Sequence, residues 1–321
     1  MKLKTTLAAA ASGLALFLAG PALAQEHDHA HTHAHEHAGH HDAASDKATA
    51  TQSKTAMPAL WKVADEDTTI WLFGTVHALP DGIEWYAGPV KTALAGSEEL
   101  VTEIILDEST TAEMQKLVME KGMLPADQTL RGLLDEGQTE RYEATMTKLG
   151  LPVAAFDRFE PWYASMMFAM LPLMQQGYSP EAGVEFSLAR HAGEGKKRGE
   201  LETIEYQLSM FDDLPQAKQL DYMMQTIDKV DEIKPMIDKM VGEWMEGDAD
   251  GLADLMNESM DDALIAETLL YTRNRAWAEW IDERLDTPGE IFVAVGAGHL
   301  AGAQSVQDAL TDRGIETTRI Q

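Results

Sequence analysis

Two histidines occupy the same short pattern near opposite ends of the sequence. Residues 69–80 read TIWLFGTVHALP, and residues 291–302 read IFVAVGAGHLAG. Each is an apolar run of strand type that ends in Gly-x-x-His, with His77 in the first and His299 in the second. Imidazole serves as a metal ligand and as a general base, and glycine lets a backbone approach its neighbours closely. The matched pattern predicts that both histidines lie at one edge of a sheet, in one pocket.

A carboxylate that could complete such a site lies in residues 99–106, ELVTEIIL. Glu103 stands inside this apolar run, where a carboxylate is costly unless it is paired with a cation or a metal. Two histidines and a carboxylate are a common ligand set for a hydrolytic metal centre that keeps one position for water. The residues therefore predict a metal site made of His77, His299 and Glu103. The other interpretation is that each histidine is an ordinary hydrogen-bonding residue at a strand end.

The elements that would position these residues follow from the periodicity of apolar residues. Residues 59–65 and 68–79 are expected to form a β-hairpin, followed by a helix over 88–98 and a strand over 99–106. Residues 195–204 are expected to return a strand to the sheet, and the chain closes with a strand (290–300), a helix (301–313) and a strand (315–320). The helices expected between them cover residues 109–122, 138–150, 160–177, 214–230, 232–247 and 265–285.

This order of elements predicts an α/β fold, with a mixed α+β arrangement as the alternative. The closing strand–helix–strand unit repeats the order of the opening unit. The expected architecture is therefore two similar halves, each containing sheet strands, with a large helical insertion between them. The turns that end in His77 and His299 would then lie at the carboxyl edge of the sheet, where loops of α/β folds expose side chains to a shared crevice.

The beginning of the sequence indicates export. Residues 1–24 have a basic start, an apolar core and small residues before Gln25, which is typical of a secretory signal peptide. Residues 25–57 are expected to be a disordered tail and linker, and residues 58–321 a single domain. The apolar run is too short for a permanent membrane span. We therefore expect an exported protein, periplasmic or secreted, without a membrane anchor.

The expected tail contains eight of the eleven histidines: 27, 29, 31, 33, 35, 37, 40 and 41. Histidine-rich tracts are typical of flexible metal-binding segments, and imidazole suits zinc, copper and nickel. We therefore expect metal ions as partners of this tail, with a plain low-complexity linker as the alternative.

Composition excludes several classes of function. The chain has no cysteine, so disulfides, thiolate metal sites and a cysteine nucleophile are excluded. A formal net charge of −29 makes nucleic acid and anionic membranes poor partners. Neither a Gly-x-Ser-x-Gly nor a His-Glu-x-x-His pattern occurs. The glycines of residues 295–302 also match a dinucleotide-type turn, a weak pattern on its own. The 18 methionines fill the core or line an apolar groove for a peptide.

Taken together, seven segments resemble the TraB/PrgY/GumN family, which is related to the Tiki membrane proteases. The resemblance extends over residues 58–321. It rests on GTVH (74–77), LVTEIIL (100–106), EPW (160–162), AGVEFSL (182–188), LETIEYQ (201–207), RNRAWA (273–278) and VGAGHLAG (295–302). It implies an α/β fold of two similar halves with both Gly-x-x-His motifs at one site. Tiki-like members are divalent-metal-dependent peptidases, with manganese or cobalt favoured.

The resemblance also implies roles for further residues. Glu185 and Glu202 would be additional acids near the centre, Glu185 beside the metal and Glu202 or Glu103 as general base. Arg273 and Asn274 would orient the substrate or stabilise an oxyanion. The chain departs from the family pattern at two positions. Ile105 stands where a second acid is usual, and Glu160 stands where a basic residue commonly precedes Pro-Trp.

The leading hypothesis is therefore an exported metal-dependent hydrolase, and more specifically a peptidase. A manganese, cobalt or zinc ion held by His77, His299, Glu103 and Glu185 would activate a water molecule. The substrate would be a peptide or a small molecule. The alternative is a non-catalytic periplasmic protein that binds metal or peptide, and a third interpretation is an inactive family member that acts through partners.

Overall fold

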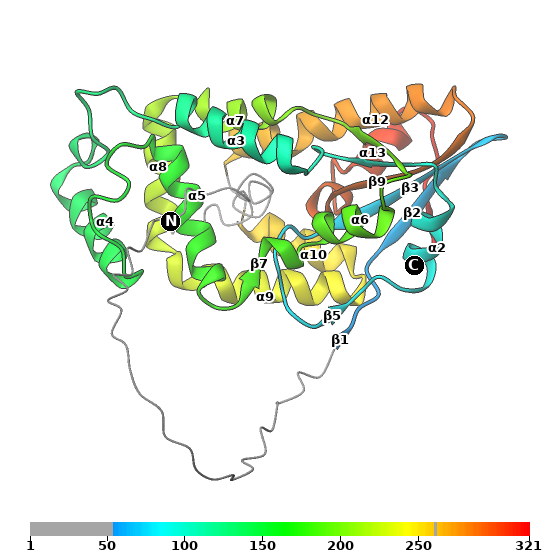
Figure 1. The fold of residues 1–321 in the computed structure, drawn as a ribbon, viewed down its shortest axis with the longest axis horizontal. Coiled ribbons are helices and arrows are strands. Elements are labelled where there is room, and N and C mark those ends of the chain that lie inside the picture. The colour runs from blue at the N-terminus through cyan, green and yellow to red at the C-terminus, as the bar shows by residue number, and fades with distance from the viewer. Residues whose placement is uncertain (1–53, 260–261) are drawn as a thin grey trace, which may run out of the picture.

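The computed structural model describes residues 54–259 and 262–321 (Figure 1). The expected signal peptide (1–24) and residues 25–53 of the expected tail lie outside the described residues. Strand β1 (Lys54–Thr55) already pairs in parallel with β5 (Ile83–Glu84). The described chain therefore joins the domain ahead of the expected boundary at Pro58.

A six-stranded mixed sheet forms one end of the molecule (Figure 1). Its order is β10-β2-β3-β9-β6-β8. The pairs β10–β2 and β2–β3 are antiparallel, and the pairs β3–β9, β9–β6 and β6–β8 are parallel. The strands are β2 (Leu60–Ala64), β3 (Thr68–Thr75), β6 (Glu99–Thr102), β8 (Lys197–Glu200), β9 (Gly289–Gly296) and β10 (Thr318–Arg319). Two short pairs, β1 with β5 and β4 (Leu79–Pro80) with β7 (Tyr178–Ser179), lie outside it.

The α/β fold class, the β2–β3 hairpin and the return of a strand at residues 197–200 are confirmed. The two similar halves are not confirmed, because all six strands belong to one sheet. β3 and β6 are parallel as expected, but β9 lies between them. The last strand, β10, pairs antiparallel with β2 at the far edge, so the closing unit does not repeat the topology of the opening one.

The two faces of the sheet are covered by different helices. On one face, Ile70 and Val293 belong to a cluster with Trp277 of α12 (Thr272–Leu285) and Leu310 of α13 (Val306–Asp312). On the other face, the alternate strand residues belong to a second, larger cluster that includes α2 (Gly88–Gly96) and the helical region. This alternation is the period of two that strands impose on their side chains. Figure 1 shows α12 and α13 along the upper edge of the sheet.

The remaining helices extend from the sheet as one helical region (Figure 1). They are α3 (Glu108–Lys121), α4 (Glu136–Lys148), α5 (Pro161–Met174), α6 (Val184–Ala192), α7 (Ile204–Asp212), α8 (Gln216–Asp228), α9 (Val230–Glu246), α10 (Ala249–Ser259) and α11 (Ala263–Ala266). A π-helical turn (Glu267–Tyr271) joins α11 to α12, so the helix expected over 265–285 is interrupted. Most expected helices are present. Helices α7 and α10 were not expected, because each is short and directly follows another element.

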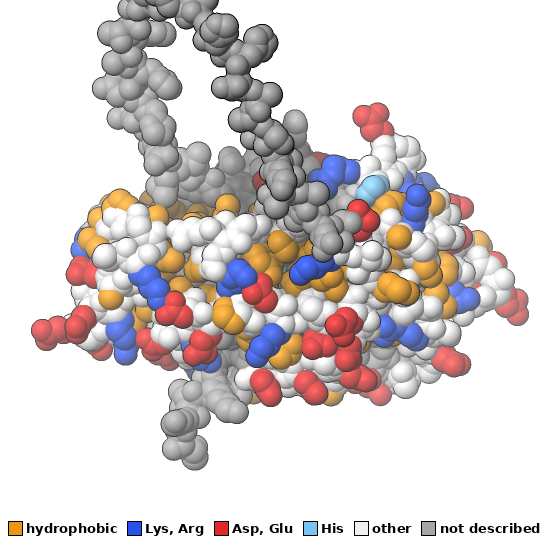
Figure 2. Space-filling model, turned by 90° about the horizontal axis from the view of Figure 1, so that it is seen from below, with side chains coloured by type: hydrophobic (Ala, Val, Ile, Leu, Met, Phe, Trp, Pro, Cys, Tyr) orange, Lys and Arg blue, Asp and Glu red, His pale blue; other side chains and the backbone are white. Residues whose placement is uncertain are grey.

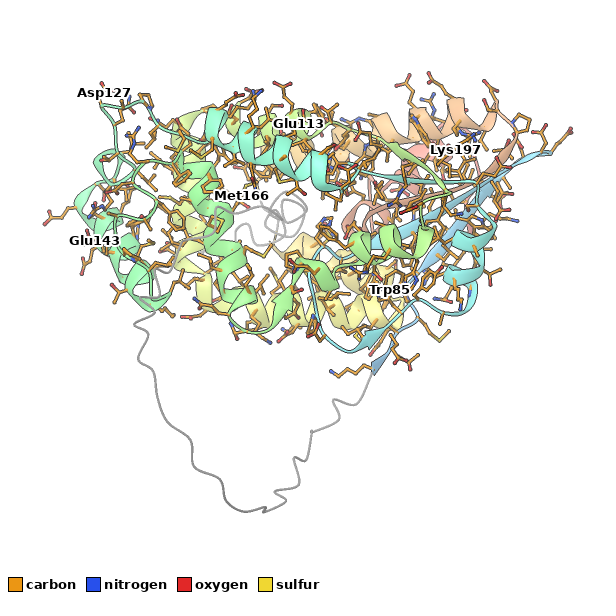
Figure 3. The ribbon with its side chains drawn as sticks, viewed as in Figure 1. Trp85, Glu113, Asp127, Glu143, Met166 and Lys197 are labelled. Carbon is orange, nitrogen blue, oxygen red and sulfur yellow. The ribbon has the colours of Figure 1, made fainter. Side chains whose placement is uncertain are left out.

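Helix α9 is fastened to the strand that carries the first Gly-x-x-His motif. The Trp244 indole Nε1 donates a hydrogen bond to the Gly74 carbonyl oxygen at 2.8 Å. The Trp244 ring also meets Trp85 edge-on, with centroids 6.3 Å apart, and Trp85 stacks on Phe73 of β3 (Trp85 is labelled in Figure 3). The carboxyl end of β3 and helix α9 therefore form one packed unit.

The surface carries acidic and basic side chains interspersed with apolar ones, as Figure 2 shows for one face. Across residues 54–259 and 262–321, no helix combines the length and apolarity that a membrane crossing requires.

The contact between Trp244 and Gly74 generates a test of this packing. Trp244→Phe removes the indole N–H that donates to the buried Gly74 carbonyl oxygen, so the free energy of unfolding should fall by about 1–3 kcal/mol. Urea denaturation followed by circular dichroism measures the change. The matched control is Trp280→Phe on α12, whose indole N–H has no hydrogen bond within the described chain and which should cost about 1 kcal/mol or less. Equal losses in both variants would contradict this account.

Candidate functional site

The two Gly-x-x-His motifs leave the sheet side by side. β3 and β9 are parallel neighbours, and Thr75 is in register with Gly296 at their carboxyl ends. The backbones then approach so closely that a Cβ on Gly74 would lie 3.0 Å from the Ala297 Cα. Gly74 and Gly296 are therefore required because a side chain would not fit beside the neighbouring atoms, and not because their backbone dihedrals demand glycine. His77 follows β3 in a loop, and His299 lies in a short 3-10 turn (Ala297–Leu300).

Gly296 marks the point where the predicted side chains meet. A Cβ placed on Gly296 would lie 3.3 Å from Glu103 Oε1, 3.5 Å from His77 Nε2 and 3.5 Å from His299 Cδ2. The three side chains thus surround one small space at the sheet edge. His77, His299 and Glu103 are 9%, 2% and 5% exposed, so water screens their charges poorly.

Glu103 directly follows β6, which ends at Thr102, rather than lying inside the strand as expected. One carboxylate oxygen, Oε1, accepts a hydrogen bond from the Gly296 N–H at 2.7 Å. The other, Oε2, accepts one from Arg273 Nη2 at 2.5 Å. Burial favours the neutral carboxyl, but the charge of Arg273, the two histidines and the Gly296 N–H together outweigh burial and hold the Glu103 pKa well below its usual range. Glu103 is therefore an anion in the interior.

Arg273 is the cation that balances this anion and a second one. Its Nε and Nη2 each donate to the Glu202 carboxylate at 2.8 Å, in a bidentate pair. Its Nη1 donates to the Leu269 carbonyl oxygen at 3.0 Å and lies 3.1 Å from His299 Nε2. Burial opposes the charge, yet the two carboxylates raise the pKa of Arg273 further.

Every N–H of this guanidinium has a partner inside the protein. The role that the resemblance implied for Arg273, to orient substrate or to stabilise an oxyanion, therefore does not match its placement. Arg273 holds the buried carboxylates, and it follows directly on the π-helical turn that ends at Tyr271. Such turns insert one extra residue into a helix and are frequent at functional sites.

Gln207 and Trp277 complete the cluster, and no role was expected for either residue. The Gln207 amide donates to Glu103 Oε2 at 3.0 Å and to Glu202 Oε2 at 2.8 Å. The Trp277 indole donates to Glu202 Oε1 at 3.0 Å, and its ring stacks under Arg273 at 4.7 Å. One signal could have revealed Gln207, since it is a lone polar residue on the buried face of α7.

His299 is held in one tautomer by Asn274. The Asn274 Nδ2 donates to the Gln304 carbonyl oxygen at 2.7 Å, which fixes Oδ1 as the atom 2.6 Å from His299 Nδ1. We therefore assign the proton to Nδ1 and the lone pair to Nε2, which faces Arg273. Burial and the charge of Arg273 hold the His299 pKa well below its ordinary value, so the ring is neutral. Asn274 therefore acts on His299 through its oxygen and on the Gln304 carbonyl through its nitrogen.

His77 forms a different arrangement with Glu185. The His77 Nδ1 and Glu185 Oε1 lie 2.5 Å apart, and neither atom has another partner in the described part of the chain. Burial lowers the His77 pKa, but the charge of Glu185, its hydrogen bond and the charge of Glu103 together outweigh burial and raise the pKa above its ordinary value. His77 thus resembles the imidazole of a catalytic histidine–acid pair, which takes up a proton at Nε2.

Gly183 makes this contact sterically possible. A Cβ on Gly183 would lie 2.2 Å from the His77 carbonyl oxygen, so only glycine lets the start of α6 lie against the GTVH segment. The Val184 N–H donates to the Val76 carbonyl oxygen at 3.0 Å. The short stretch AGVE therefore positions Glu185, the second residue of α6, beside His77.

A pocket of about 560 Å³, its open mouth included, lies over the two histidines. Its polar lining consists of both imidazoles and the Thr75 hydroxyl, which is buried and has no hydrogen-bond partner among the described residues. The rest of the lining is Val76, Ala78, Ile237, Met240, Val241, Leu252, Met256, Gly296, Ala297 and Gly298. An apolar pocket with a few convergent polar groups is the usual form of a small-molecule or substrate site.

The expected metal ligands do not fit an ion as they are placed. Over residues 54–259 and 262–321, no three His, Asp or Glu side chains are arranged to hold one. Both oxygens of Glu103 already accept hydrogen bonds, and His299 Nε2 faces a guanidinium. Glu185 Oε1 is directed at Nδ1 of His77. The positive charge at this centre is supplied by Arg273.

Ile105 and Glu160, two other residues singled out in the sequence, lie outside this cluster. The Ile105 N–H donates to Glu200 Oε2 at 3.2 Å. Glu160 precedes α5, and burial together with the charge of Asp212 raises its pKa. The remaining histidine of the described residues, His191, stacks on Tyr86 with ring centroids 3.7 Å apart.

The Arg273 cluster predicts a large difference between two arginines of one helix. Arg273→Met leaves two buried carboxylates without their cation and should lower the free energy of unfolding by about 3–5 kcal/mol. Arg275→Met removes an exposed pair with Glu267 and should cost about 1 kcal/mol or less. Urea denaturation of both variants checks this. Similar losses would mean that Arg273 does not carry the buried charge.

Comparison with known proteins agrees with the resemblance noted in the sequence. The model of the TraB/PrgY/gumN family matches residues 59–319, which include every residue of the site. No curated protein and no solved structure matches the chain. Because the family match extends over most of the sequence, the chain belongs to the TraB/PrgY/GumN family.

Proposed function

We propose that this protein is a hydrolase, and specifically a peptidase, that works in the pocket over His77 and His299. The observation that carries the proposal is the buried pair of His77 and Glu185, with His77 among the residues that line that pocket. A histidine oriented by a carboxylate is the usual general base for activating a nucleophile.

In this proposal His77 Nε2 takes a proton from water while the oxygen attacks the substrate carbonyl. Glu185 stabilises the imidazolium that forms, as the raised pKa of His77 favours. His77 then returns the proton to the leaving amine. The unpartnered Thr75 hydroxyl lines the same pocket and can donate to the developing oxyanion.

Family resemblance also suggests a divalent metal, namely manganese, cobalt or zinc. It would take nitrogen from His77 and His299 and oxygen from Glu103 and Glu185. Such an ion would polarise the carbonyl and acidify a water molecule. Because these donors do not fit an ion as placed, no step is assigned to a metal. Metal dependence remains a separate proposal that requires Arg273 to withdraw from His299.

The other candidate is a binding protein without turnover, for peptide in the pocket or for metal at the histidine-rich residues 25–57. The apolar lining of the pocket agrees with binding as well as with hydrolysis. Turnover therefore has to be measured directly.

Hydrolysis of a peptide library followed by mass spectrometry tests the proposal. His77→Ala should reduce kcat by about 10²–10⁴-fold, because the general base is lost. Glu185→Gln should reduce it as well, since the imidazolium loses its counter-charge. His191→Ala is the matched control and should leave the rate unchanged. Unaltered hydrolysis by His77→Ala would overturn the proposal.

The same assay decides the question of the metal. After exhaustive chelation, the protein that starts at Gln25 should retain its rate if His77 acts as proposed. A rate that disappears and returns with manganese, cobalt or zinc would support the metal instead. An absence of hydrolysis under every condition would favour the binding protein.

We also propose that the protein is exported to the periplasm or secreted, because residues 1–24 have the composition of a signal peptide. Mass spectrometry of the exported fraction should find an N-terminus at Gln25. Leu16→Arg, which places a charge in the apolar core of this segment, should retain the protein in the cytoplasm at full length. Export of that variant in processed form would contradict the proposal.

A further inference from the structure

The pocket over the two histidines has two unlike sides. One side is the polar floor formed by Thr75, His77 and His299. The opposite side, here called the apolar wall, consists of Ile237, Met240 and Val241 of α9 and Leu252 and Met256 of α10. None of the residues that line the pocket is Asp, Glu, Lys or Arg. A pocket lining without charged side chains is unusual for a chain with 54 acidic residues and a net charge of −29.

The apolar wall is held in place by contacts with both Gly-x-x-His segments. The Trp244 indole ties α9 to the Gly74 carbonyl oxygen. On the other side, Met256 lies over Gly298, where an added Cβ would come within 2.3 Å of its Cε and 2.6 Å of its Sδ. These two contacts hold the apolar wall against the segments that carry His77 and His299. Figure 1 shows α9 and α10 running together along the lower edge of the molecule, beside the sheet.

Five aliphatic and thioether side chains line a pocket that also contains the His77 imidazole, so this pocket favours a narrow class of substrate groups. A charged substrate side chain would lose its hydration and find no partner on this wall. An apolar side chain would leave water and fill the space. Two of the five wall residues are methionines, which adapt to ligands of different shape.

We propose that the apolar wall selects the substrate: it binds an uncharged, apolar side chain of a peptide, at the residue adjacent to the amide that is cleaved. This inference rests on the proposed peptidase function and names its substrate class. The preferred residues are leucine, isoleucine, methionine and phenylalanine. Aspartate, glutamate, lysine and arginine are rejected at that position.

The test is a set of capped peptides that differ at one residue next to the scissile amide. With leucine there, kcat/KM should exceed that with alanine by about 10-fold or more, since one methylene in an apolar pocket is worth about 10–200-fold. Aspartate and lysine peptides should be cleaved more slowly still. Equal rates for leucine, alanine, aspartate and lysine would overturn the inference while the peptidase function stands.

Two variants of the apolar wall should shift the preference in opposite directions. Val241→Phe fills the pocket, so the ratio of leucine to alanine peptides should fall toward or below one. Leu252→Ala enlarges it, so phenylalanine should gain on leucine. The control Leu310→Ala removes an equally buried leucine from α13, in the cluster on the other face of the sheet, and should leave the preference unchanged. If Val241→Phe does not fold, the change in preference from leucine to phenylalanine in Leu252→Ala still tests the inference.

A binding measurement separates the two proposals if no peptide is cleaved. Isothermal titration would compare acetyl-leucyl-leucinamide with acetyl-seryl-serinamide on the protein that starts at Gln25. Binding of the leucine compound alone, lost in Val241→Phe, would uphold the apolar wall while the peptidase function falls. Equal affinity for both compounds, or no change in Val241→Phe, would overturn the apolar wall.

Discussion

A buried group of one arginine and two glutamates determines how the candidate site is assembled. Removing charges from water is expensive, and burial is tolerated only when every charge and every donor is satisfied. Arg273 satisfies Glu103 and Glu202, which follow two different strands of the parallel sheet, β6 and β8. The Gly296 N–H at the end of β9 completes the shell of Glu103. Loss of Arg273 would leave two buried carboxylates without a cation, so this residue holds the strand ends in one arrangement.

The surroundings of the two histidines shift their pKa values in opposite directions. The positive charge of Arg273, together with burial, keeps the pKa of His299 low. His77 instead faces the carboxylate of Glu185 and has a raised pKa. Sites that separate the proton affinities of two similar groups assign them different roles. Here one imidazole is suited to take up a proton, and the other is suited to remain a neutral hydrogen-bonding group.

The local elements could be predicted from the sequence because their signals are local. The β2–β3 hairpin, most of the helices and the shared sheet edge of His77 and His299 follow from apolar periodicity and from the repeated Gly-x-x-His pattern. The position of β9 between β3 and β6 could not be predicted, because it depends on a pairing between segments some 200 residues apart. The sequence also could not predict that every N–H of Arg273 has a hydrogen-bond partner inside the protein. Its partners Glu103, Glu202 and Leu269 come together only in the fold, and they leave the expected metal ligands already engaged.

The place of β9 in the sheet couples the order of synthesis to the site. This strand begins at Gly289, near the end of the chain, yet it supplies the hydrogen-bonding partner for β3 on one side and for β6 on the other. A nascent chain that has not yet reached it holds a split sheet, with His77 and Glu103 on separate pieces. The pocket over the histidines can therefore close only after β9 has been made, and a chain that lacks this strand carries parts of the site without the site itself.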